Sequence, residues 1–76
     1  MKITAETAKR ALFYIDRGDT FGQAAHDLEI TLTSIAPYTD YRTEAVLRLF
    51  RWLERRPQDK QAQDIAFLRQ LSAKAA

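Results

Sequence analysis

The sequence has no cysteine, and its 76 residues include only two glycines, two prolines and one histidine. Without cysteine, neither a disulfide nor a thiolate metal site can stabilise the fold. The lone histidine, His26, has no second histidine with which to bind a metal ion. No Gly-rich phosphate loop and no carboxylate pair with catalytic spacing is present. We therefore expect no catalytic residues, no metal or other cofactor, and a protein that is not an enzyme, with His26 at the surface.

Long hydrophobic runs are also missing. No apolar run comes near the roughly 20 residues needed to cross a bilayer, and the first residues carry Glu6 instead of the apolar stretch of a signal peptide. A composition of 46% hydrophobic and 29% charged residues is typical of a folded domain. We expect one domain over residues 1–76, in the cytoplasm and without membrane contact.

Apolar residues recur at helical spacing along most of the chain, and strand-like alternation is almost absent. Thr4 and Thr20 are placed to cap helices, and Gly18 follows the expected end of the first one. The pattern predicts an all-α fold of four or five helices, over residues 5–16, 20–28, 39–56 and 58–73, with a short helix before Pro37 capped by Thr31 or Thr33.

Residues 20–35 carry the most specific pattern, which is that of a helix-turn-helix. Ala25 is the small residue at which two helices would cross, and Leu28 and Ile35 are apolar anchors on either side of a turn. Glu29 occupies the turn position that usually holds glycine. We expect a helix-turn-helix-like core, with a rigid corner around Ala25.

The segment 14–25 reads YIDRGDTFGQAA. Over residues 8–38 the chain resembles the N-terminal helix-turn-helix domain of insertion-sequence transposases and of small phage regulators. The resemblance implies a regulator of transcription that places residues 31–38 in or near a groove of duplex DNA. Phosphate contacts would come from arginines of the next helix. The expected DNA-binding residues are Thr31, Leu32, Thr33, Ser34, Ala36, Arg42, Arg48 and Arg51.

The charges around this pattern favour a second interpretation. No Lys or Arg lies between Arg17 and Arg42, whereas that window holds four carboxylates. Because DNA affinity depends largely on basic residues that neutralise phosphates, the same fold is suited to binding a protein, for instance as an inhibitor of a host defence or regulatory complex. Arg and Trp on one helix face also suit a protein interface. The expected interface residues are Asp27, Glu29, Tyr41, Arg48, Trp52 and Arg55.

These two hypotheses stay open at the level of sequence, with DNA binding ranked first. The acidic window and the basic face of residues 39–56 make the molecule dipolar, which also permits a homodimer. The net charge of +2 is too small to decide between DNA and protein as the partner.

Overall fold

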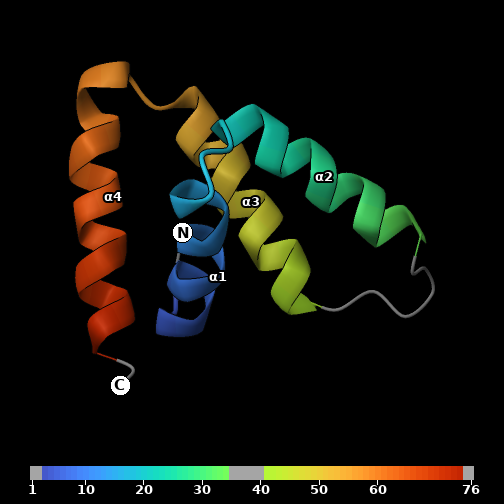
Figure 1. The fold of residues 1–76 in the computed structure, drawn as a ribbon, viewed down its shortest axis with the longest axis horizontal. Coiled ribbons are helices and arrows are strands. Elements are labelled where there is room, and N and C mark those ends of the chain that lie inside the picture. The colour runs from blue at the N-terminus through green and yellow to red at the C-terminus, as the bar shows by residue number, and fades with distance from the viewer. Residues whose placement is uncertain (1–2, 35–40, 75–76) are drawn as a thin grey trace.

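The computed structural model describes residues 3–34 and 41–74, and in this part of the chain it shows four helices and no strand (Figure 1). The helices are α1 (Ala5–Asp16), α2 (Phe21–Ser34), α3 (Tyr41–Arg55) and α4 (Gln58–Ala73). The predicted all-α class is therefore confirmed. None of these helices combines the length and the apolar character that a bilayer crossing requires.

Most helices begin or end at the residues that the sequence predicts as caps or helix ends. The hydroxyl of Thr4 accepts a hydrogen bond from the Thr7 N–H at 3.2 Å, and that of Thr20 accepts one from the Gln23 N–H at 3.1 Å. Gly18 has φ +94°, and its N–H donates to the Ile15 carbonyl, so the chain turns sharply out of α1. Pro57, with φ −56° and ψ 142°, lies between α3 and α4.

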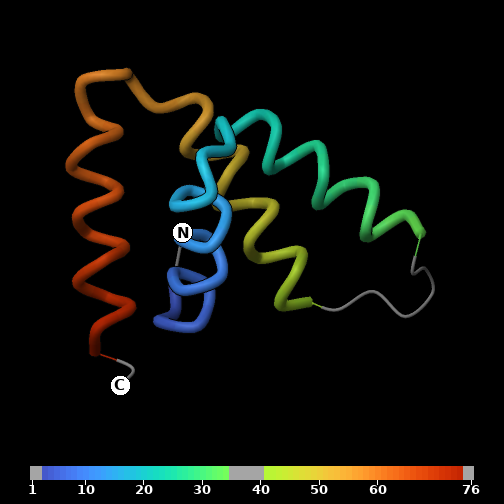
Figure 2. Tube along the Cα trace, viewed as in Figure 1, coloured from blue at the N-terminus to red at the C-terminus, as the bar shows by residue number. Residues whose placement is uncertain are grey.

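The helices form two packed pairs. α2 packs mainly against α3, α4 packs mainly against α1, and α1 also contacts α3, so that the two pairs share one core. In Figures 1 and 2, α4 descends beside α1 in the opposite direction, and α3 returns opposite to α2. The buried residues come from all four helices: Ala8, Ala11, Leu12, Ala24, Ala25, Leu28, Val46, Leu49, Phe50, Leu53 and Leu68.

Small residues on α2 allow the close approach of α3. Ala24 and Ala25 are fully buried, in the core that α2 shares with α3. Phe50 fills the space between the helices, with its ring centroid 5.7 Å from that of Tyr14 and 6.1 Å from that of Phe21. The prediction that Ala25 lies at a helix crossing agrees with its burial, but the helix that mainly packs against α2 is α3.

The predicted turn after Leu28 is wrong. α2 runs without a break from Phe21 to Ser34, and no non-glycine residue in the described part of the chain, Glu29 included, has a positive φ. The expected caps Thr31 and Thr33 are interior helical residues. Their hydroxyls donate to the carbonyls of Asp27 and Glu29, at 3.0 and 2.9 Å, instead of accepting from the N–H groups of a new helix.

Residues 21–34 therefore form one continuous helix and not two helices joined at a corner. The remaining residues of the helix-turn-helix prediction, Ile35 and Pro37, lie outside the described residues, as does Thr39, the expected start of the next helix. α3 ends at Arg55, one residue before the predicted end.

Candidate functional site

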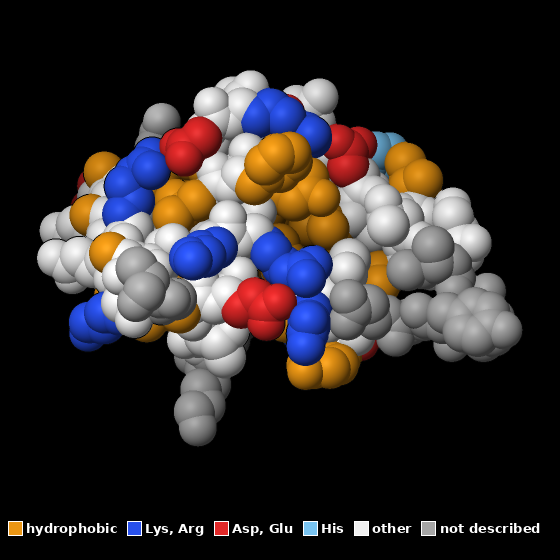
Figure 3. All heavy atoms as spheres, turned by 60° about the horizontal axis from the view of Figure 1, so that its bottom comes forward, with side chains coloured by type: hydrophobic (Ala, Val, Ile, Leu, Met, Phe, Trp, Pro, Cys, Tyr) orange, Lys and Arg blue, Asp and Glu red, His pale blue; other side chains and the backbone are white. Residues whose placement is uncertain are grey.

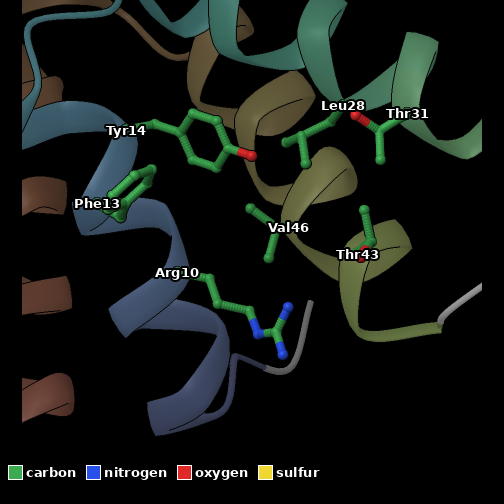
Figure 4. A pocket seen from close by; sticks show the side chains of 7 residues that line it. All are labelled: Arg10, Phe13, Tyr14, Leu28, Thr31, Thr43 and Val46. Atoms are coloured by element: carbon green, nitrogen blue, oxygen red, sulfur yellow. The ribbon is translucent and has the colours of Figure 1, made fainter.

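A groove of about 230 Å³ lies between α1, α2 and α3. Figure 4 shows seven side chains around it: Arg10, Phe13, Tyr14, Leu28, Thr31, Thr43 and Val46. Small-molecule pockets usually enclose about 300–1,000 Å³. The volume of this open groove lies below that range, and it suits one or two protruding side chains of a partner better than a cofactor.

The walls of the groove are mainly apolar. Leu28 and Val46 are core residues that also border the groove from α2 and α3. Thr31 uses its hydroxyl within α2, because its Oγ1 donates to the Asp27 carbonyl, and its methyl group adds to the apolar wall (Figure 4).

Two aromatic rings form the α1 side of the groove. Phe13 is 62% exposed, and its ring meets that of Tyr14 edge to face, with centroids 5.5 Å apart. Tyr14 in turn meets the buried ring of Phe50 edge to face. This stack connects an exposed ring to the hydrophobic core, so the wall has little freedom to collapse.

Charged side chains border the apolar wall. The guanidinium of Arg17 lies 5.4 Å from the ring centroid of Phe13 and 4.9 Å from that of Tyr14. Its Nη2 lies 2.6 Å from Asp19 and 3.6 Å from Asp27, and the bonded carboxylate of Asp19 raises the pKa of Arg17. On the face turned forward in Figure 3, hydrophobic side chains are exposed between Lys and Arg side chains.

Two larger hollows have a more polar lining. One, of about 420 Å³, lies between Ile3, Thr7 and the start of α3, and its wall includes the hydrogen-bonded pair Arg48 and Glu44 at 2.6 Å. The other, of about 450 Å³, lies beside the turn between α1 and α2 and is bordered by polar residues such as Asp19, Thr20 and Gln61. The smaller groove is therefore the most apolar concave surface among these three.

The residues predicted to bind DNA do not converge on one surface. Thr31 faces the groove, whereas Thr33 and Ser34 line a shallow hollow on the outer side of α2 with His26, Glu29 and Ile30. Leu32 lies in the last turn of α2 and is partly buried, and Ala36 lies outside the described residues.

The three arginines expected on phosphates each contact a carboxylate of this chain. Arg42 lies 3.4 Å from Glu6, and Arg48 binds Glu44. Arg51 hydrogen-bonds to Glu29 and also contacts Glu54, and these carboxylates raise its pKa. The predicted basic face is thus partly neutralised within the molecule.

The residues predicted for a protein interface are also divided. Asp27 and Glu29 engage Arg17 and Arg51, while Tyr41 and Arg48 line the hollow beside Ile3. Trp52 is partly buried under the guanidinium of Arg56, which lies 4.7 Å from the ring centroid. Arg55 is exposed, and its Nε donates to the Arg51 carbonyl at 3.3 Å. Binding of DNA or of a protein by these two sets of residues stays a prediction.

Sequence reasoning missed the groove itself. Phe13 follows the buried pair Ala11 and Leu12 and lies off the apolar stripe, so its position on a helical wheel predicts exposure. Arg10 and Thr43 carry no comparable signal, because they join the groove only through the packing of α1 against α3. In the described part of the chain, no cluster of His, Cys, Asp or Glu is suited to a metal ion.

Comparison with models of known protein families, with curated proteins and with solved structures finds no match to this chain.

Proposed function

We propose that this chain is a protein-binding domain without catalytic activity, which holds an apolar segment of a partner protein in the groove between α1, α2 and α3. The observation that carries the proposal is Phe13, a large aromatic residue that is 62% exposed at the edge of an apolar groove. Aromatic residues beside a preformed apolar pocket are typical of the anchor positions in protein interfaces.

The proposed partner is a protein, as in the second interpretation of the sequence, but the proposed contact surface is the groove and not the surface that includes Asp27 and Glu29. Asp27 and Glu29 already face Arg17 and Arg51, so a basic partner would have to displace these arginines before it could use either carboxylate. The groove requires no such exchange, because burying its apolar wall stabilises a complex directly. The absence of cysteine fits a reducing compartment, and we place this activity in the cytoplasm as part of the proposal.

DNA binding stays a prediction with weaker support. The continuous helix over residues 21–34 has no turn after which a short second helix could enter a DNA groove. Arg42, Arg48 and Arg51 would have to exchange a carboxylate for a phosphate, which reduces the gain from each contact. Gel-shift measurements with random duplex DNA at several salt concentrations test this alternative. Binding that weakens steeply with salt and is lost in the Arg48→Ala, Arg51→Ala double variant would favour it over the groove.

Selection from a display library of random 12-residue peptides tests the proposed function. Selected peptides are measured against the wild-type domain and against two variants, Phe13→Ala and Phe67→Ala. Phe67 is a matched control, because it is 52% exposed on α4 and does not line the groove. Phe13→Ala should weaken binding at least about tenfold, equivalent to about 1.4 kcal/mol, and Phe67→Ala should leave it unchanged.

Both substitutions remove a largely exposed ring, so circular dichroism should show the same helical content for each variant. If no selected peptide binds, or if the two variants bind peptides equally well, the groove is not a protein-binding site.

A further inference from the structure

Arg10 lies at one end of the groove, one helical turn before Phe13 and Tyr14. Its guanidinium points to the space between α1 and the start of α3, below the side chain of Val46 (Figure 4). The side chain is 41% exposed. A charged group therefore adjoins the apolar wall at the end opposite to Tyr14.

The ion pair of Arg10 is loose. Its Nη2 lies 3.4 Å from Oε1 of Glu6, which is longer than the roughly 2.7–2.9 Å of a good charge-assisted hydrogen bond. The same oxygen lies 3.4 Å from Nη1 of Arg42, so one carboxylate oxygen of Glu6 serves two guanidinium groups. Exposed pairs of this kind contribute little to stability, and Glu6 can be displaced from Arg10 at little cost.

Arg17, at the other end of the aromatic wall, is held differently. Its Nε and Nη2 donate to Asp19 at 3.0 and 2.6 Å, and Asp27 lies nearby. With two carboxylates around one guanidinium, Arg17 has little attraction left for a further anion. Arg17 does not line the groove, whereas Arg10 does, so an incoming carboxylate is attracted to Arg10.

We infer that the partner segment carries a bulky apolar side chain and, close to it in space, an Asp or Glu that pairs with Arg10. The two partner side chains must lie close together, because Arg10 and Phe13 are three residues apart on α1, about 4.5 Å along the helix axis. A bound partner would exclude water from the pair between Arg10 and this carboxylate, and the attraction would strengthen as the local dielectric constant falls. This inference rests on the proposed function of the groove.

The random 12-residue peptide library provides the test. Peptides that bind the wild-type domain should share an aromatic or large aliphatic residue with an Asp or Glu within four positions of it. Their affinity should fall at least about tenfold with Arg10→Glu, and selection on that variant should give Lys or Arg at the acidic position.

Lys9→Glu is the matched control. It makes the same change of charge on the neighbouring residue of α1, which is exposed and does not line the groove. Its peptide affinity should stay within about twofold of wild type if the effect of Arg10 is local. Arg10→Gln, which removes the charge without repelling Glu6, replaces Arg10→Glu if that variant does not fold.

The outcomes separate the inference from the proposed function. If selected peptides bind, and lose binding with Phe13→Ala, but show no acidic preference and respond equally to Arg10→Glu and Lys9→Glu, the groove binds protein and the inference about Arg10 is wrong. If no peptide depends on Phe13, the proposed function fails and the inference fails with it.

Discussion

Arg51 of α3 is hydrogen-bonded to Glu29 of α2 across the interface between these two helices. In the sequence, Arg51 belongs to the basic face of residues 39–56 and Glu29 to the acidic window between Arg17 and Arg42, so each is expected to meet a different partner. Packing of α2 against α3 brings them together. Positive and negative charges that are far apart in the sequence therefore lie side by side on the folded surface at this position.

A charge-exchange series tests this pair. Arg51→Glu should destabilise the fold, because it places a third carboxylate beside Glu29 and Glu54, and adding Glu29→Arg should restore much of the loss. Free energies of unfolding from urea denaturation, combined in a double-mutant cycle, measure the coupling. Strictly additive effects would mean that the two side chains do not interact in solution.

The helical conformation of Glu29 predicts which of two substitutions at this position, alanine or glycine, gives the more stable protein. In a helix interior, glycine is less stable than alanine by about 1 kcal/mol, whereas in a turn with positive φ glycine is the better residue. Both variants remove the pair with Arg51, so their difference reports backbone conformation alone. We expect Glu29→Ala to be the more stable of the two in thermal or urea unfolding. Greater stability of Glu29→Gly would indicate the turn of a helix-turn-helix.

Much of the fold could be predicted from the sequence because its determinants are local. Thr4 and Thr20 cap helices with hydroxyls that reach N–H groups three residues away, and Gly18 takes the positive φ that its position suggests. Leu28 could not be interpreted in the same way. Its apolar spacing to Ala24 and Ala25 suits either a helix-turn-helix or a longer helix, and only the packing of α3 against that stripe decides between them.

The candidate site could be predicted to a smaller extent. Leu28 and Val46 are expected in the core, but the groove that they border depends on how far α1 lies from α2 and α3. Thr31 was expected to meet DNA as a helix cap, and its hydroxyl instead satisfies a carbonyl of its own helix. The shape of the groove depends on distances between helices, which cannot be read from the sequence.

The two glycines should respond in opposite ways to alanine. Gly18 has φ +94°, where a side chain is strained, so Gly18→Ala should cost about 1 kcal/mol. Gly22 lies in the first turn of α2 without a positive φ, and the atom that a Cβ would meet is the flexible end of Glu54. Once Glu54 moves aside, Gly22→Ala should raise stability by up to about 1 kcal/mol. Urea unfolding measures both, and a large loss with Gly22→Ala would show that Glu54 cannot move.

Asp16 and Arg69 form an exposed ion pair between α1 and α4, and its small contribution to stability should depend on pH. Hydrogen bonds from Arg69, the shorter at 2.7 Å, lower the pKa of Asp16 below its ordinary value of about 3.9. A carboxylate with a lowered pKa stabilises the fold above the unfolded-state pKa, and this contribution is lost as pH falls through the folded-state pKa.

An NMR titration of the Asp16 carboxyl should therefore show a midpoint below about 3.9 in the wild-type domain and a return toward that value with Arg69→Gln. The difference in stability between these two proteins should be present at neutral pH and vanish in strong acid. Equal midpoints in both proteins would mean that the pair does not persist in solution.

The most direct measurement of groove binding is a comparison of backbone amide chemical shifts in the free domain and in its complex with a selected peptide. Binding in the groove predicts the largest changes at Phe13, Tyr14, Leu28, Thr31 and Val46, and little change around Phe67 on α4. Changes confined to α4, or to His26 and Ile30 on the outer side of α2, would contradict it.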